Sequence, residues 1–185
     1  MYYKSILGLQ PIINMSTILQ ATINDVTEAV ALVNSAYRGE SSKQGWTSES
    51  HLLEGIRIDE TEMAGYFERS EITLLKYVNE QDRIDGFVYL EQIKNNRLYL
   101  GMLTVNPTLQ AGGIGRQLLN AADDHARKLG CEAVKISVIT SRKELIAWYE
   151  RRGFIATGKV MPLVTTTSVA KEPVDLMIME KLLSR

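Results

Sequence analysis

The sequence predicts a single α/β domain of mixed element order, built on a mostly antiparallel sheet that is flanked by helices. Three consecutive strand patterns between residues 72 and 105 are joined by polar turn residues, which favours an antiparallel meander. A strongly amphipathic helix pattern from Ile114 to Leu129 follows, and after it strand and helix patterns alternate. No repeat or long linker divides the 185 residues. We therefore assign one domain to residues 15–185 and treat residues 1–14 as an N-terminal extension that need not be ordered.

The first part of the domain combines one strand with helical segments. Asp25 and Glu28 have the spacing of a capping box, and apolar residues then recur at i, i+4, i+7 and i+11. The next stretch is rich in Gly, Ser and Lys, which favours a loop. The predicted elements are a strand at Thr17–Thr22, a helix at Val26–Tyr37, a loop at Arg38–Thr47, and short helices at Glu49–Leu53 and Thr61–Arg69.

The meander is predicted from strands at Ile72–Val78, Ile84–Gln92 and Arg97–Val105. The third of these has apolar side chains on both faces, which indicates a central strand covered on both sides. Pro107 ends it, because proline has no ladder donor and restricts the residue before it.

The long helix is predicted to close at Gly130, with Asp123 and Arg127 as an i,i+4 pair on its outer side. Ser141 and Glu144 have capping-box spacing for a further helix. The remaining predicted elements are a strand at Ala133–Ile139, that helix through Arg152, strands at Phe154–Thr157 and Val174–Lys181, and a loop at about Val160–Pro173.

Composition restricts the class of partner. The 21 basic residues nearly balance the 22 acidic ones, so no electrostatic footprint for nucleic acid or an anionic membrane is expected. No apolar run approaches the roughly 18 residues of a membrane-spanning helix. The single cysteine, Cys131, and the absence of a recognisable export signal favour the cytoplasm. Met15 is a possible second start site.

The most informative segment runs from Val105 to Arg116, from a buried strand into the start of the long helix. Its glycines allow a ligand close to the main chain, and a helix N-terminus presents free amide groups, which together suit a pyrophosphate. An ordinary strand-to-helix loop is the alternative. A Walker loop does not fit, because Gly115 is followed by arginine, and a dinucleotide fingerprint fails at Leu118.

Two segments resemble the GNAT acetyltransferase superfamily. Gln110-x-x-Gly113-x-Gly115, after a Val-x-Pro strand end, is similar to the family's pyrophosphate-binding signature. The segment from Trp148 to Phe154 resembles the family's Tyr-x-x-x-Gly-Phe, and the order of elements matches from Thr17 to Lys181. Arg142 departs from the pattern, since the position seven before the tyrosine is often asparagine.

The resemblance implies a sheet splayed between its fourth and fifth strands, Arg97–Val105 and Ala133–Ile139, with acetyl-CoA bound there. The pantetheine arm would bond main-chain groups of the open strand. The activity implied is transfer of the acetyl group to a primary amine. We expect a small-molecule acceptor, and an amine of a peptide or protein is the alternative. The implied cofactor-binding residues are Leu103, Thr104, Val105, Gln110, Ala111, Gly112, Gly113, Ile114, Gly115, Arg116 and Arg142.

The resemblance also implies that Tyr149 is the general acid; core packing is the alternative for this residue. For the general base the candidates are Glu91 and Glu40, although such carboxylates are usually solvated, and an ordered water is another possibility. The acceptor pocket is expected to draw on Tyr37 and Trp46, with a core role as the alternative for the tryptophan.

No metal is predicted, because no ligand spacing is present. A monomer and a homodimer both remain open. The rival function is a non-catalytic acyl-CoA sensor or interaction module of the same fold.

Overall fold

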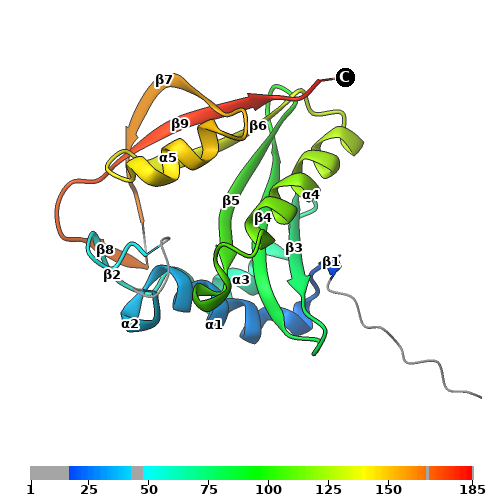
Figure 1. Ribbon diagram of the computed structural model, residues 1–185, viewed down its shortest axis with the longest axis vertical. Coiled ribbons are helices and arrows are strands. Elements are labelled where there is room, and N and C mark those ends of the chain that lie inside the picture. The colour runs from blue at the N-terminus through cyan, green and yellow to red at the C-terminus, as the bar shows by residue number, and fades with distance from the viewer. Residues whose placement is uncertain (1–16, 43–47, 166, 185) are drawn as a thin grey trace, which may run out of the picture.

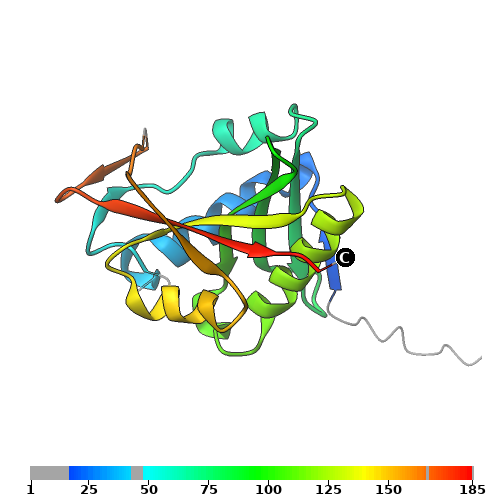
Figure 2. The same ribbon diagram turned by 90° about the horizontal axis from the view of Figure 1, so that it is seen from above.

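The computed structural model describes residues 17–42, 48–165 and 167–184. Its main feature is a seven-stranded sheet in the order β1-β3-β4-β5-β6-β9-β7, in which only the β5–β6 pair is parallel. The predicted mostly antiparallel α/β architecture is confirmed, and Figures 1 and 2 show it from two directions. The strands are β1 (Thr17–Gln20), β3 (Ile72–Val78), β4 (Ile84–Ile93), β5 (Arg97–Val105), β6 (Ala133–Ile139), β7 (Ile155–Pro162) and β9 (Asp175–Leu182).

A second, two-stranded sheet pairs β2 (Leu53–Gly55) with β8 (Ser168–Ala170). Five helices complete the described part of the chain, with short 3-10 segments η1 (Ile23–Asp25) and η2 (Pro107–Leu109). The helices are α1 (Val26–Tyr37), α2 (Gly39–Ser42), α3 (Glu60–Tyr66), α4 (Ile114–Lys128) and α5 (Lys143–Glu150).

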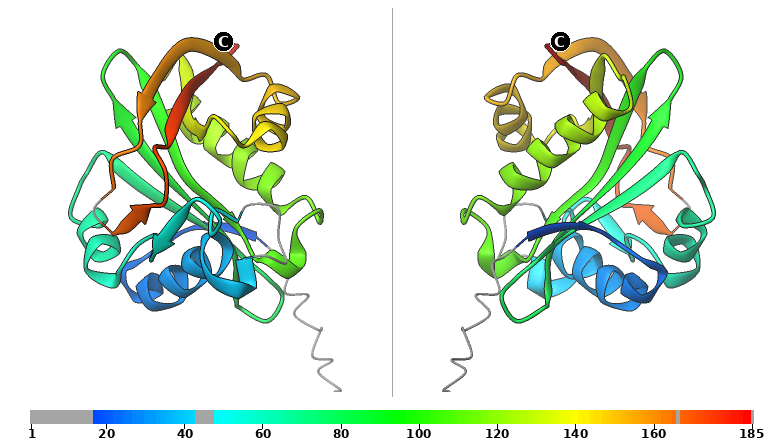
Figure 3. Two further views of the ribbon diagram at one scale, coloured as in Figure 1. Left: turned by 90° about the vertical axis from the view of Figure 1, so that its left-hand side faces the viewer. Right: turned by 90° about the vertical axis from the view of Figure 1, so that its right-hand side faces the viewer.

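Helices cover both faces of the large sheet (Figure 3). On one face α1 and α3 bury Val33 and Met63 against Phe87 of β4. On the other face α4 and α5 contribute Leu118 and Tyr149 to a separate cluster with residues of β3 to β6. The predicted central position of β5 is explained by these two cores, which bury apolar area on each side of it.

The two middle strands of the sheet pair over only part of their length. Register between β5 and β6 runs from Arg97 opposite Ala133 to Tyr99 opposite Lys135, after which the strands diverge (Figure 1). In β5, Met102 has a φ of +46°, and the β4–β5 register shifts beside it. A bulge of this kind bends a strand, so β5 turns away from β6 at this point.

Three local predictions are wrong. The segment predicted as a helix at Glu49–Leu53 is a turn that leads into β2, because Leu53 gains burial against Ile139 and Val174 while pairing with β8. The predicted loop after α1 begins with the short helix α2. Part of the predicted loop at 160–173 extends β7, and another part forms β8.

Three predicted side-chain arrangements also differ. The Asp25–Glu28 capping box is not formed, because Asp25 makes no cap bond for α1 and accepts from the Thr22 amide instead. The N-cap of α5 is Arg142, without a side-chain cap bond, so the Ser141 capping box is not formed. Asp123 pairs with Lys181 of β9 at 2.5 Å, whereas Arg127 pairs with Asp124 at 3.0 Å. The pair with β9 forms because the Asp123 side of α4 faces the sheet and not the solvent: the Asp123 side chain is only 13% exposed.

Candidate functional site

The glycine turn after β5 presents main-chain N–H groups. Gly113 is the N-cap of α4 and has a φ of +85°, a conformation that favours glycine. The amides of residues 113–116 donate to no acceptor within the described residues. They stand at the N-terminus of a 15-residue helix, where the helix dipole favours negative charge. Unpaired amides at a helix N-terminus are the geometry that anion sites in proteins use, so the turn is a candidate anion site.

These amides open into a cavity of about 340 Å³, which we call the glycine-turn cavity. Its walls come from the end of β5, the turn, the start of α4, and the facing side of α5. The lining residues are Tyr37, Leu103, Val105, Leu109, Gln110, Ala111, Gly113, Ile114, Gly115, Arg116, Leu145, Trp148, Tyr149 and Arg152.

A second cavity of about 360 Å³ lies where β5 and β6 separate, and we call it the sheet cavity. Residues of β2 and β8 contribute to its other side. It contains five charged residues, and it shares four lining residues with the glycine-turn cavity, so the two cavities meet. The charged residues are Arg38, Glu49, Arg57, Glu62 and Arg142; the shared ones are Tyr37, Leu103, Leu145 and Tyr149.

Tyr149 of α5 stands at this junction. Its ring packs edge-on against Trp148 and Phe154, with centroids 5.0 and 5.3 Å away. Its hydroxyl makes no hydrogen bond within the part of the chain that the structure describes. Burial, and then the neighbouring phenols of Tyr37 and Tyr99, raise the pKa of Tyr149 above its ordinary range. The side chain is therefore a neutral phenol whose proton is available for donation.

Tyr37 fixes the open edge of β5 from the other side. Its hydroxyl donates to the Leu103 carbonyl at 3.0 Å, and burial raises its pKa to about 12. The amide of Asn106 donates to the carbonyl of Asp85 in β4 at 2.9 Å. Because successive peptide groups of a strand point to opposite sides, the amide of Val105 points toward the edge that β6 leaves unpaired.

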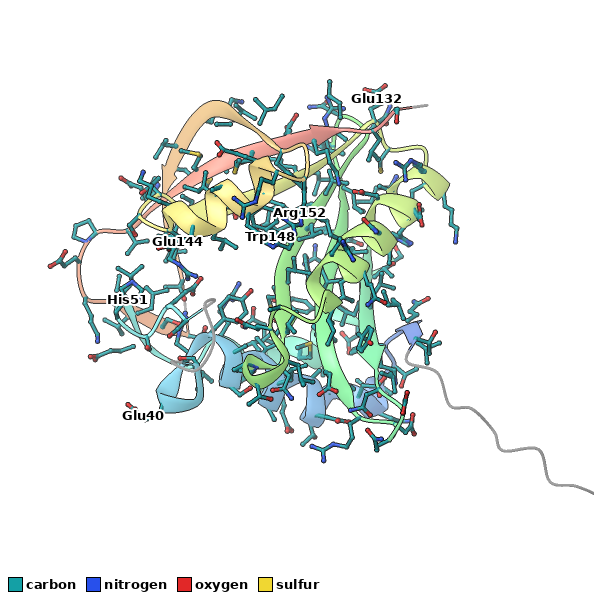
Figure 4. All side chains as sticks on the ribbon, in the orientation of Figure 1. Glu40, His51, Glu132, Glu144, Trp148 and Arg152 are labelled. Carbon is teal, nitrogen blue, oxygen red and sulfur yellow. The ribbon has the colours of Figure 1, made fainter. Side chains whose placement is uncertain are left out.

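Two functional candidates were missed by the sequence analysis. The Arg152 guanidinium lies 3.6 Å from the centre of the Trp148 ring and donates to the Trp148 carbonyl at 2.7 Å; Figure 4 labels both side chains. Burial, with Arg151 and Arg116 nearby, lowers the Arg152 pKa. Its Nε is buried without a partner among the described residues. The sequence could have indicated this pair, because a tryptophan and an arginine four residues apart lie on the same face of a helix.

Most of the predicted cofactor-binding residues line the glycine-turn cavity, but three do not. Thr104 is fully buried and donates to the Met102 carbonyl at 2.9 Å, and Gly112 lies outside the cavity wall. Arg142 lines the sheet cavity instead, where its guanidinium donates to the Ser48 carbonyl at 2.9 Å.

The two carboxylates predicted as bases are not brought to the junction. Glu91 accepts hydrogen bonds from Arg69 and Tyr89, each at 2.7 Å, and lines neither cavity. Glu40 lies on α2 and points away from both cavities (Figure 4). Trp46 lies outside the described residues.

Two carboxylates that the sequence analysis did not select line the sheet cavity. Glu49 pairs with Arg38 at 2.7 Å, and Glu62 accepts the Tyr66 hydroxyl at 2.6 Å. Glu62 has capping-box spacing from Asp59, which indicates a helix start and no catalytic role, and Glu49 belongs to no motif. Only the folded arrangement therefore brings the two to the cavity.

Within the described ranges, no group of three or more His, Cys, Asp or Glu side chains is placed to hold a metal ion. None of the helices in these ranges is long and apolar enough to cross a membrane.

The mixed sheet flanked by helices, with a glycine turn between β5 and α4, places the chain in the fold class of the GNAT acyltransferases. The chain belongs to the acetyltransferase (GNAT) family, whose model matches residues 33–154. The resemblance drawn from the two sequence segments is thereby confirmed.

Curated relatives match over part of their length. The chain is 34% identical over 79 residues to a mycothiol acetyltransferase of Propionibacterium freudenreichii, covering 43% of this chain and 22% of that protein. It is 35% identical over 72 residues to an acetyltransferase of Agrobacterium fabrum, covering 39% and 51%. The matches thus span no more than about half of either relative. A putative acetyltransferase from Salmonella typhimurium, solved with acetyl-CoA, shares the fold with a TM-score of 0.68 at 20% identity, over 92% of this chain and 95% of that one.

Proposed function

We propose that the chain is an N-acetyltransferase that moves the acetyl group of acetyl-CoA to a primary amine of a small molecule. One observation carries the proposal: free amides of the glycine turn open into a cavity that meets a second, charged cavity at Tyr37 and Tyr149. One cavity suits the donor and the other suits the acceptor. The family match supports the same assignment.

The residues of the glycine-turn cavity fit acetyl-CoA. The amides of residues 113–116 would donate hydrogen bonds to the diphosphate, and the guanidinium groups of Arg116 and Arg152 would add positive charge. The unpaired edge of β5 offers the Val105 amide to the pantetheine arm. When bound, acetyl-CoA supplies the thioester carbonyl that the amine attacks.

The reaction joins the amine nitrogen to the acetyl carbonyl carbon and breaks the carbon–sulfur bond. The amine must lose a proton, and the departing thiolate must gain one. We assign the second proton to Tyr149, because it lines both cavities and its raised pKa keeps it protonated. Its unpartnered hydroxyl is free to turn toward the sulfur.

We assign acceptance of the amine proton to Glu62. It lines the acceptor side, where Glu91 and Glu40 do not. The other carboxylate there, Glu49, is committed to the buried Arg38 guanidinium, so protonating it would leave that cation unpaired.

The test combines cofactor binding with turnover. Millimolar acetyl-CoA is expected to raise the melting temperature, and an amine panel is expected to release free CoA thiol. Tyr149→Phe should keep the thermal shift and lose about 10²- to 10⁴-fold in kcat. Glu62→Gln should also lower kcat, whereas Glu91→Gln is a matched control that should not. Absence of a thermal shift contradicts the cofactor assignment.

The same experiment separates this proposal from a non-catalytic sensor. A sensor would give the thermal shift with acetyl-CoA but no thiol release with any amine. In that case Tyr149→Phe would have no turnover to lose.

A further inference from the structure

Four of the five charged residues that line the sheet cavity have polar partners. Arg38 and Glu49 pair with each other, Arg142 donates to a main-chain carbonyl, and Glu62 accepts a hydrogen bond from the Tyr66 hydroxyl. Arg57 is the exception. Its guanidinium makes no hydrogen bond or ion pair with any residue in the described ranges, and it lies over the Tyr37 ring, 5.9 Å from the ring centroid.

The Arg57 main chain is held firmly although its side chain is unpaired. Its amide donates to Asn34 Oδ1 at 2.7 Å, and its carbonyl accepts the Thr167 hydroxyl at 3.3 Å. These bonds tie it to α1 on one side and to the segment before β8 on the other. The guanidinium therefore starts from a fixed point on the cavity wall, which lowers the entropy lost on binding an anion.

The charges of the cavity favour an acceptor that carries a negative group. Three guanidinium groups face two carboxylates, and the Arg38–Glu49 pair cancels internally. A polycationic acceptor would meet net repulsion from the remaining arginines. An acceptor with one amine and one carboxylate would give Glu62 and Arg57 each an opposite charge, while Arg142 keeps its hydrogen bond to a main-chain carbonyl.

Resting on the proposed function, we propose that the acceptor is a small amino acid-like molecule whose carboxylate binds the Arg57 guanidinium while its amine faces the junction at Tyr149. Arg57 and Glu62 line the same cavity yet form no ion pair with each other. Each therefore stays available to the opposite charge of such a molecule. Tyr37 contacts Arg57 and also lines both cavities, so the anion site lies beside the reacting junction and suits a compact acceptor.

The test compares matched acceptors. The free amino acids are assayed for acetyl-CoA-dependent thiol release, and each that reacts is compared with its amide and its decarboxylated amine. In the wild-type protein the carboxylate form should exceed the amide by about 10- to 100-fold in kcat/KM, the range expected for a charge-assisted hydrogen bond.

Variants assign the preference to one residue. Arg57→Gln should lower kcat/KM for the amino acid by about 10- to 100-fold, because the carboxylate needs the guanidinium. The kcat/KM for the amide should stay within about twofold of its wild-type value, because the amide carries no charge to bind. Arg57→Lys should recover part of the loss, since charge remains but the bidentate fork does not. Arg127→Gln, on the exposed side of α4, is the control and should change neither substrate.

The outcomes separate the two proposals. Turnover of amines with no preference for a carboxylate, or an equal loss for acid and amide in Arg57→Gln, overturns this inference and leaves the transferase assignment intact. If no amine is acetylated, the proposed function fails, and thermal shifts with amino acids in the presence of CoA decide the inference. A shift that Arg57→Gln abolishes supports the carboxylate site, and no shift in the wild-type protein overturns it.

Discussion

At the residue scale, Gly113 combines a conformational requirement with a binding requirement. Gly113→Ala should destabilise the fold by about 1–2 kcal/mol, because alanine disfavours a φ of +85°. It should also raise KM for acetyl-CoA about tenfold, since the added methyl group stands at the anion site. Gly130→Ala is the matched control: its φ is +71°, it ends the same helix, and no atom lies within 4 Å of the added carbon. Denaturant unfolding and initial rates measure the two effects, and an equal KM change in both variants would refute the assignment.

Tyr37 gives a pH prediction. Its folded pKa is about 12, above the value of about 10 in an unfolded chain. The stability that this difference contributes is complete below pH 10 and is lost as pH rises toward 12, because the unfolded phenol ionises first. Tyr37→Phe should show a shallower decline between pH 10 and 12, by up to about 1.4 kcal/mol per pH unit. Urea unfolding at fixed pH values checks it, and parallel declines for both proteins would contradict it.

At the element scale, the long helix α4 is joined to β9 by an ion pair in a setting shielded from water. Asp123 and Lys181 are each 13% exposed, and the second oxygen of Asp123 has no partner among the described residues. Lys181→Met should cost about 3–5 kcal/mol, because it leaves a shielded carboxylate uncompensated. Adding Asp123→Leu should restore much of the loss. Arg127→Met, which breaks the exposed pair on the same helix, should cost less than about 1 kcal/mol. Thermal unfolding of the three variants and the wild-type protein measures this, and a small effect of Lys181→Met would show that the pair is not coupled to stability.

Elements with their own periodicity were predictable, and elements that depend on distant partners were not. The pattern of α4 and the alternation of β3, β4 and β5 reproduce the observed bounds within a residue or two. In contrast, β2 and β8 are three residues each and exist because they pair with one another across more than a hundred positions. Local propensity carries no signal for such a pairing, which explains the wrong helix prediction at residues 49–53.

At the scale of the whole molecule, the sequence predicted the residues of the glycine-turn cavity but not those of the sheet cavity. The glycine turn is a contiguous segment whose residues line one cavity together. The sheet cavity takes Glu49, Arg57 and Glu62 from separate elements, and only folding brings them together. The bases predicted at Glu91 and Glu40 were chosen by position along the chain, and neither reaches that cavity.

The split between β5 and β6 also makes a prediction about adjacent amides. If the pantetheine arm binds the open edge of β5, acetyl-CoA should slow hydrogen exchange at the Val105 amide, which points toward that edge. The next amide, that of Asn106, already donates to the Asp85 carbonyl and should change little. Residue-resolved exchange with and without acetyl-CoA measures the pair, and Gly113→Ala should weaken the protection at Val105 by weakening binding. Equal protection of both amides would instead indicate that the whole sheet tightens on binding, and it would place the arm elsewhere than on the edge of β5.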